Sequence, residues 1–206
     1  MNYLAHLLLA EDDPMSRVGN LLGDFVSGRP ETLDLPVRVV QGIIRHRAID
    51  RFADDHPVTA RLMALVSPER RRFAGVIVDV THDHFLTRRW QDYCPQPLHT
   101  FISDCNQALR DHFELLPNAL AETLEHRIAD DWLGRYGTEE GLDAVFHRVS
   151  LRSRRFLPIL GAIEDVNRHR AEFEAGFLKF FPELQAFVRD LGPEAKVVID
   201  RSDTPA

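Results

Sequence analysis

Two carboxylates lie one helical turn apart in an apolar stretch at residues 76–90 (VIVDVTHDHFLTRRW). On an α-helix, Asp79 and Asp83 share one face, and His82, three residues after Asp79, flanks that face. An ionised carboxylate among apolar side chains is costly unless it is paired, fully hydrogen-bonded or bound to a metal. The stretch therefore predicts a nearby cation, either an arginine in a structural ion pair or a metal ion.

The same spacing of polar groups recurs in two other predicted helices. His46 and Asp50 stand at positions i and i+4 within the segment RVVQGIIRHRAIDRFADDH. Asn20 and Asp24 repeat that spacing within the segment SRVGNLLGDFVSG. If the three helices converge, they gather carboxylate oxygens and an imidazole, which are ligands for one or two divalent ions of the Mg or Mn type. The sequence matches no established metal motif, so this prediction rests on the repeated spacing.

Histidines and arginines near these helices complete the set of candidate groups. His6 interrupts the apolar run YLAHLLLA, where it is either a core histidine bonded to a backbone carbonyl or a group of the site. His84 follows Asp83 directly and points about 100° away from it on the helix, so it flanks the site. Arginines on the site-bearing helices, Arg47 among them, are candidates for holding a phosphate or an acidic partner.

Helical periodicity extends over the whole chain, and the only β-like run is the short one at 197–199. At 206 residues the chain can bury one sizeable core, and no low-complexity linker divides it. We therefore expect an all-α fold, a single compact multi-helix domain over 1–206, with a poorly ordered tail from about residue 192. We expect about eight or nine helices. They cover 3–10, a segment that begins at Pro14, 38–56, 58–66, a segment that begins after Ser67 and contains Asp79 and Asp83, 98–116, 120–136, 138–149 and 163–191. Pro182 should kink or break the last of them.

Phenylalanines recur at helical spacing in the segment 163–191. A stripe of this kind is far more often part of a core than of a cofactor site, because aromatic side chains dominate the buried contacts between helices. We therefore assign no chemistry to it. The stripe contains Phe173, Phe177, Phe180, Phe181 and Phe187.

The charge balance argues against a general nucleic-acid binder. The chain carries 32 Asp and Glu against 25 Lys and Arg, a formal net charge of −7, whereas binding by counterion release requires a basic surface. Cys94 and Cys105 are not in a C-x-x-C arrangement, and the apolar run at the N-terminus is too short to span a bilayer and lacks a preceding basic region. These features predict a reduced, cytoplasmic protein with no membrane or nucleic-acid partner.

Four blocks of the sequence together resemble the acyl carrier protein phosphodiesterase family, whose members are also called acyl carrier protein hydrolases. The blocks are MNYLAHLLLA, GNLLGDFVSG, GIIRHRAIDRFADDHP and VIVDVTHDHFLTRRW, in this order. The resemblance implies an HD-domain-like helical bundle, since the family is regarded as a divergent branch of the HD-domain metal-dependent phosphohydrolases. It also implies removal of the 4′-phosphopantetheine arm from the serine of holo-acyl carrier protein, a reaction of lipid metabolism linked to fatty acid biosynthesis, with Mn²⁺, Mg²⁺ or a similar ion.

The family blocks contain the candidate residues already singled out, but His82, which lies within the last block, is not part of the family pattern. The adjacent His-Asp doublet of ordinary HD proteins is also missing, because the order here is Asp83-His84. Under the resemblance, one histidine would protonate the departing serine oxygen and an arginine would steady the phosphate. The expected metal ligands are Asp24, His46, Asp50, Asp79 and Asp83, and the expected catalytic residues are His6, Arg47 and His84.

Two other functions stay open at this point. One is an HD-type nucleotide phosphohydrolase, although the sequence has no base-reading motif, and the other is a non-catalytic helical module that docks an acidic partner through its arginines. A carrier protein, which the resemblance implies is acidic, must approach an enzyme of net charge −7. Because only charges near the site act at nearly full strength, we expect a basic docking rim made by Arg70, Arg71 and Arg72, together with Arg88 and Arg89.

Overall fold

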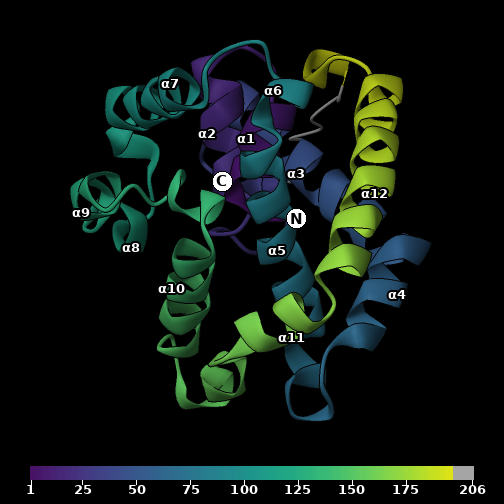
Figure 1. The fold of residues 1–206 in the computed structure, drawn as a ribbon. Coiled ribbons are helices and arrows are strands. Elements are labelled where there is room, and N and C mark those ends of the chain that lie inside the picture. The colour runs from purple at the N-terminus through teal and green to yellow at the C-terminus, as the bar shows by residue number, and fades with distance from the viewer. Residues whose placement is uncertain (197–206) are drawn as a thin grey trace.

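The computed structural model describes residues 1–196, which form an all-α fold, as expected, with no β-strand in that part of the chain (Figure 1). Six short 3-10 helices, η1 to η6, connect or extend the α-helices. The twelve α-helices are α1 (Tyr3–Leu9), α2 (Pro14–Leu22), α3 (Val37–Asp55), α4 (Pro57–Leu65), α5 (Ala74–Arg88), α6 (Trp90–Tyr93), α7 (Leu98–Asp111), α8 (Asn118–Ala121), α9 (Leu124–Ala129), α10 (Glu139–Ser150), α11 (Ala162–Arg168) and α12 (Arg170–Leu191).

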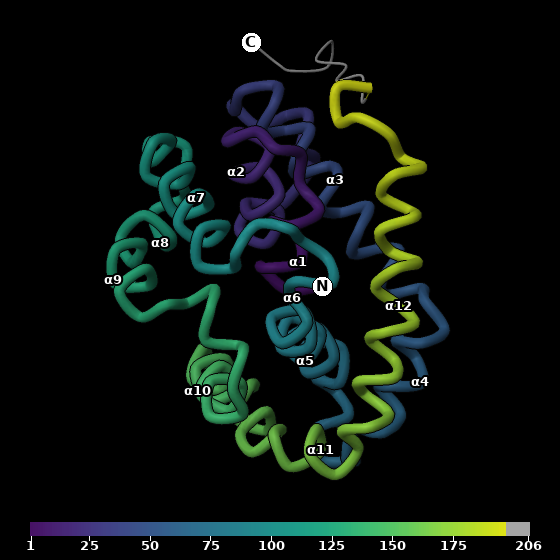
Figure 2. The backbone as a smooth tube through the Cα atoms, turned by 45° about the horizontal axis from the view of Figure 1, so that its top comes forward, coloured from purple at the N-terminus to yellow at the C-terminus, as the bar shows by residue number. Residues whose placement is uncertain are grey.

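Helix α5 runs through the middle of the assembly, with α10 on one side and α12 and α4 on the other (Figures 1 and 2). It packs against α1, α4, α10 and α12. Its buried side chains therefore point in several directions, among them Ile77, Val78, Phe85 and Leu86. This explains why apolar residues recur around nearly the whole helix. A carboxylate on α5 must find its partner inside the protein.

Helices α2 and α3 approach each other closely at two glycines. A Cβ built on Gly19 would lie 2.3 Å from the carbonyl oxygen of Val39, and one built on Gly42 would lie 2.9 Å from the Cα of Gly19. Any larger side chain at either position would separate the two backbones. The close approach brings the middle of α3 against the last turns of α2.

Local sequence features set several helix ends at the expected positions. Helix α2 begins at Pro14, and the side chain of Asp13 caps it by accepting a hydrogen bond from the backbone N–H of Ser16 at 2.8 Å. Helix α3 ends before His56 and Pro57, because a residue that precedes proline is disfavoured in the α region.

Three expectations about the elements are corrected. Residues 1–196 contain twelve α-helices rather than eight or nine, because α6 was not expected, the helix expected at 120–136 is divided into α8, α9 and η4, and the one expected at 163–191 is divided into α11 and α12. Asp131, in the first of these divided segments, has a φ of 44°. The segment after Ser67 first forms η2 (Pro68–Phe73), so α5 starts only at Ala74. Pro182 lies inside α12, and the break before this helix falls at His169.

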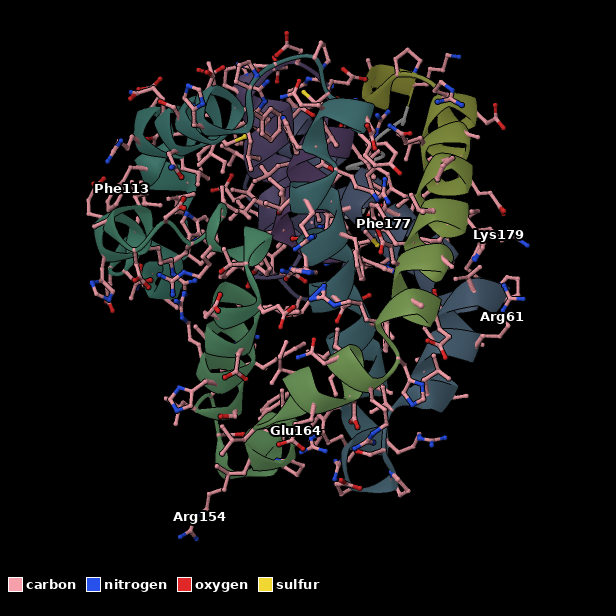
Figure 3. The ribbon with its side chains drawn as sticks, in the orientation of Figure 1. Arg61, Phe113, Arg154, Glu164, Phe177 and Lys179 are labelled. Atoms are coloured by element: carbon pink, nitrogen blue, oxygen red, sulfur yellow. The ribbon has the colours of Figure 1, made fainter. Side chains whose placement is uncertain are left out.

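The aromatic stripe of α12 is part of the core, as expected. Phe173, Phe177, Phe180 and Phe181 are fully buried. Figure 3 labels Phe177, whose ring lies 6.0 Å from that of Phe85 on α5. The stripe therefore joins α12 to the central helix.

The end of the described chain packs against the rest of the fold. Residues Glu194–Lys196 form the 3-10 helix η6, and the side chain of Glu194 is buried. The end of the tail, which is expected to be poorly ordered, lies outside the described residues. The β-like run at 197–199 lies outside the described residues. Among residues 1–196, none of the helices combines the length and the apolar character that a membrane span requires.

Candidate metal centre

Two histidines and one aspartate from α1 and α3 meet at one point. The rings of His6 and His46 stack with their centroids 3.7 Å apart. His6 Nε2 lies 3.0 Å from Asp50 Oδ1, and His46 Nε2 lies 3.0 Å from Asp50 Oδ2. One ligand atom from each of the three residues lies within 4.8 Å of the other two, so together they could hold one metal ion. The i, i+4 spacing places His46 and Asp50 on the same face of α3.

A backbone carbonyl fixes the orientation of His46. Its Nδ1 lies 2.6 Å from the carbonyl oxygen of Asn20 on α2, and because a carbonyl can only accept, Nδ1 carries the proton and donates. In the neutral ring, Nε2 then has a lone pair directed at the carboxylates, which is the usual arrangement of a metal-binding histidine. Gly23 leaves room for the ring, since a Cβ there would lie 2.2 Å from His46 Cγ.

Three carboxylates border the two buried histidines toward the solvent. The side chains of Asp24, Asp50 and Asp79 are 38%, 34% and 27% exposed. Asp24 Oδ1 lies 3.6 Å from His46 Nε2. The α-ammonium group of Met1 lies 3.2 Å from Asp50 Oδ1 and 3.2 Å from Asp79 Oδ1, so it links these two acids. A substrate can therefore reach the centre from its acidic side.

Burial and neighbouring charges set the protonation of this group. Burial acts to lower the pKa of His46, but hydrogen bonds and charge from Asp24 and Asp50 outweigh it and raise the pKa to about 9. Burial and the neighbouring His46 lower the pKa of His6 to about 4. Burial acts to raise the pKa of Asp50, but its hydrogen bonds to both histidines hold that pKa well below its usual range. In the metal-free centre, the proton between the carboxylates is therefore held by His46 and not by His6.

The donor set fits a divalent metal ion. Imidazole nitrogens suit ions such as Zn²⁺ and Fe²⁺, and carboxylate oxygens suit ions such as Mg²⁺ and Mn²⁺, so the mixed set accepts ions of both kinds. Nδ1 of His6 is buried without a hydrogen-bond partner in the described part of the chain. The ring is therefore held by its stacking on His46 and by the contact of its Nε2 with Asp50.

Asp83, one of the expected ligands, holds a helix N-terminus instead of facing this group. Its side chain is fully buried, and its two oxygens accept hydrogen bonds from the backbone N–H groups of Leu4 at 2.9 Å and Ala5 at 3.1 Å. These residues form the first turn of α1. Asp83 therefore positions the helix that carries His6.

The two histidines that flank Asp83 along the chain also lie behind the centre. His84 Nδ1 lies 2.6 Å from the carbonyl oxygen of Tyr136, which places this ring on the side of α5 that faces η4. The ring of His82 stacks on Phe180 of α12 with centroids 4.9 Å apart. Neither histidine lies against the carboxylates of the metal centre, and the expected role of His84 in protonation remains a prediction.

Arg47, the expected phosphate-binding residue, bonds to the loop after α2. Its guanidinium donates to the carbonyl oxygens of Gly28 at 2.6 Å and Val26 at 3.2 Å. Arg47 thus fixes the segment that follows Asp24. Side-chain spacing alone gives no indication of such backbone bonds.

Asn20 contributes through its backbone and not through its side chain. The side-chain amide donates to the carbonyl oxygen of Ser16 at 3.0 Å and to Glu194 Oε1 at 2.9 Å. Its carbonyl oxygen is the group that orients His46. The i, i+4 spacing pointed to the side chain of Asn20, whereas the structure uses a backbone oxygen, an atom that every residue possesses.

The expected docking rim at Arg70 and Arg71 is corrected. Arg70 donates to the carbonyl oxygen of Leu160 at 3.3 Å and lies 3.6 Å from Asp165, and Arg71 donates to the carbonyl oxygen of Val66 at 3.0 Å. Arg70 joins η2 to η5 and α11, and Arg71 joins η2 to the end of α4, at the opposite end of the molecule from α2 (Figure 1). They form a structural junction away from the metal centre.

Comparison with known proteins places the chain in a family. The family model described as acyl carrier protein phosphodiesterase matches residues 1–184. The chain belongs to this family. It is therefore a hydrolase that acts on phosphodiester bonds.

Curated relatives share about a third of their residues with this member of the acyl carrier protein phosphodiesterase family. The acyl carrier protein phosphodiesterase of Serratia proteamaculans is 35% identical over 191 residues, which cover 92% of this chain and 98% of the relative. Those of Pectobacterium atrosepticum and Escherichia coli O157:H7 are 31% and 33% identical, and the matches cover 92% and 90% of this chain and 98% and 96% of the relatives. No solved structure matches the chain, so the HD-domain-like arrangement remains a prediction.

Proposed function

We propose that this protein is a metal-dependent phosphodiesterase that hydrolyses the 4′-phosphopantetheine arm from the serine of holo-acyl carrier protein and releases apo-acyl carrier protein. Membership of the acyl carrier protein phosphodiesterase family supports the substrate. The observation that carries the metal dependence is the convergence of His6, His46 and Asp50. The reduced cysteines, Cys94 and Cys105, and the substrate fit a cytoplasmic enzyme of lipid metabolism.

We propose Mn²⁺ as the ion, held by His6, His46 and Asp50, with Asp24 and Asp79 completing the acidic border. When bound, such an ion lowers the pKa of a water molecule and neutralises charge on the phosphoryl oxygens. The chain's own residues position these components. The Asn20 carbonyl aims His46, Asp83 anchors the start of α1, and the half-exposed Asp24 lies on the side from which the phosphodiester approaches.

The test is release of phosphopantetheine from holo-acyl carrier protein by metal-free enzyme, with and without added Mn²⁺. Asp50→Asn removes the carboxylate that faces both histidines, so we expect at least about a 100-fold loss of Mn²⁺ affinity and of activity, above the range seen when only a supporting partner is lost. Asp55→Asn, an exposed acid at the end of the same helix, is the matched control and should retain both.

Three outcomes would reject parts of the proposal. Activity that survives exhaustive chelation would exclude the metal dependence. A nucleotide from a panel of substrates that is hydrolysed faster than holo-acyl carrier protein would favour an HD-type nucleotide phosphohydrolase. A protein that neither binds Mn²⁺ nor turns over any phosphodiester would instead be a docking module.

A further inference from the structure

Three arginines, Arg127, Arg148 and Arg152, lie close enough together for Arg148 and Arg152 to repel Arg127, with Arg127 and Arg152 beside Tyr3, and we call them the arginine cluster. Arg152 Nη2 lies 3.4 Å from the Tyr3 hydroxyl oxygen. The ring of Trp132 packs on that of Tyr3 with centroids 5.3 Å apart, and the Arg127 guanidinium carbon lies 5.6 Å from the Trp132 ring centroid. The cluster therefore joins α9, α10 and the segment after α10 to the start of α1.

Two members of the cluster, Arg127 and Arg152, contact no carboxylate within residues 1–196. The third, Arg148, pairs with Asp130 at 2.8 Å, and Asp130 also pairs with Arg135. Arg127 donates to the hydroxyl of Thr123 at 2.8 Å, and Arg152 contacts Tyr3. Burial, and then the positive charges of Arg152 and Arg148, lower the pKa of Arg127. A bound anion would relieve this repulsion, and guanidinium groups suit carboxylate and phosphate oxygens.

The arginine cluster lies beside the metal centre. Tyr3 precedes His6 by three residues on α1, so both point from adjacent positions on one side of that helix. The ring of Tyr3 also stacks on Phe25 with centroids 5.9 Å apart. Phe25 follows Asp24, whose carboxylate lies 3.6 Å from His46. A macromolecule with its phosphodiester at the centre can therefore reach the cluster with a neighbouring part of its surface.

We propose that Arg127 and Arg152, assisted by Arg148, bind acidic side chains of the carrier protein next to its modified serine, an inference that rests on the proposed function. The arm has one phosphate at the scissile bond, and that phosphate must lie at the metal centre during hydrolysis. The anions left to bind the cluster at the same time are carboxylates of the protein. An enzyme of net charge −7 also needs positive charge near its site, because charges beyond about 8 Å are screened at physiological ionic strength.

The first test compares two double variants of equal charge change. Arg127→Gln/Arg152→Gln removes the unpaired members of the cluster. Arg61→Gln/Lys179→Gln removes two exposed charges on α4 and α12, at the other side of the molecule (Figure 3). We expect the first variant to raise KM for holo-acyl carrier protein about tenfold at low salt, with kcat within twofold, since surface charges govern encounter more than chemistry. The control should match the wild type.

A small substrate separates docking from phosphate binding. With bis(p-nitrophenyl) phosphate, which lacks a protein surface, kcat/KM should be the same in both double variants and in the wild type. An equal loss with this small diester would show that the cluster binds the phosphate itself and would overturn the docking proposal. An unchanged KM for holo-acyl carrier protein at low salt would overturn it as well.

A binding measurement keeps the docking proposal distinguishable from the proposed function. Fluorescence anisotropy of labelled apo-acyl carrier protein, which has no arm to cleave, should show wild-type binding that weakens with salt and is about tenfold weaker in the cluster variant. If the wild type binds apo-acyl carrier protein in this way but does not hydrolyse holo-acyl carrier protein, the proposed function is rejected and the docking site is not. Absence of salt-sensitive binding would reject the docking site. Should the double variant melt below the wild type, Arg152→Gln, at an exposed position, provides the same comparison.

Discussion

At the scale of single residues, Asp83 shows how a carboxylate can serve a site without touching it. Helix α1 has only seven residues, and its N-cap residue, Asn2, makes no side-chain capping bond. Asp83 of α5 supplies the missing acceptors for the first N–H groups. Burial raises the pKa of Asp83 to about 7, while the bonds from Leu4 and Ala5 act in the opposite direction.

Substitution of Asp83 separates capping from metal binding. Asp83→Asn keeps one oxygen acceptor, so we expect a loss of about 1 kcal/mol in the free energy of unfolding, and Asp83→Ala should lose about 2 to 3 kcal/mol because buried N–H groups are left unpaired. Urea unfolding gives these values. Mn²⁺ affinity of folded Asp83→Asn should stay within about threefold of the wild type. A variant that is stable but does not bind Mn²⁺ would make Asp83 a ligand, as its spacing predicted.

His82 gives the protein a second buried ionisable group on α5. Its side chain is 1% exposed, and neither ring nitrogen has a hydrogen-bond partner among the described residues. Burial, with smaller contributions from the N-terminal ammonium and His56, lowers the pKa of His82 to about 3. The folded protein therefore keeps this ring neutral at a pH where the unfolded chain protonates it.

The stability of the metal-free protein should consequently fall in acid. Below pH 6.5 the unfolded chain takes up a proton that the folded chain does not accept until about pH 3, and each pH unit in this window costs about 1.4 kcal/mol. Between pH 7 and pH 5 His82 should therefore remove about 2 kcal/mol of stability. In His82→Phe, whose ring can still stack on Phe180, the fall in the free energy of unfolding between pH 7 and pH 5 should be smaller by this amount, as measured by urea unfolding at each pH. Equal slopes would mean that the ring is protonated in the folded protein.

At the scale of elements, the close contact of α2 with α3 depends on residues without side chains. A Cβ on Gly42 would lie 2.9 Å from the carbonyl oxygen of Ser16 and from the Cα of Gly19. All of these are backbone atoms, which cannot move aside as a flexible side chain does. The same contact holds His46 of α3 against the Asn20 carbonyl of α2.

We therefore expect Gly42→Ala to destabilise the protein by about 2 to 3 kcal/mol, the usual range for overpacking. Gly75→Ala is the matched control, because Gly75 is also helical and a Cβ there meets nothing within 4 Å. This control should be neutral or slightly stabilising. Thermal and urea unfolding of both variants measure the difference. Equal stability of Gly42→Ala and the wild type would mean that the helices can separate without cost.

The helices themselves could be predicted where one periodic pattern and its caps act alone. Pro14 starts a helix as its position implies, α3 ends before the His56-Pro57 pair, and the i, i+4 pair of His46 and Asp50 lies on one face. The short turns around Asp131 could not be predicted, because tertiary contacts stabilise them more than any repeated pattern. Pro182 was expected to disturb the last helix, but burial of the phenylalanines on both sides of it holds α12 together.

The candidate site was less predictable than the fold, because spacing identifies residues that share a face but not the group that each one contacts. His46, Asp50 and Asp24 are near one another as the pattern implied. His6, which the sequence left between a core and a site role, is part of the candidate metal group. Asp83 has the same spacing from Asp79 as Asp50 has from His46, yet its partners are backbone N–H groups of a segment 79 residues away.

At the scale of the whole molecule, the chain returns from α12 to the back of the metal centre. Glu194 of η6 is fully buried and lies outside the part of the chain that the family model matches, residues 1–184. Its Oε1 accepts from Ser16 at 2.8 Å and Asn20 at 2.9 Å, and it lies 3.3 Å from Arg45 Nε. Its Oε2 lies 3.1 Å from Arg38 Nη1. Glu194 thus ties the C-terminal segment to α2 and α3 together.

Removal of this side chain should weaken both the fold and the centre. Glu194→Ala leaves buried donors unpaired, so we expect a loss of about 3 kcal/mol in the free energy of unfolding. Glu194→Gln keeps an acceptor for Asn20 and should lose less. Because Asn20 orients His46 through its carbonyl, Mn²⁺ affinity should fall about tenfold in the alanine variant and less in the glutamine variant, as for other supporting partners of metal ligands.

Glu172→Ala, an exposed change on α12, is the control for urea unfolding and Mn²⁺ titration. If Glu194→Ala unfolds at the same urea concentration as this control, the C-terminal segment does not stabilise the α2 and α3 pair. If it is less stable but binds Mn²⁺ normally, the orientation of His46 does not depend on Glu194.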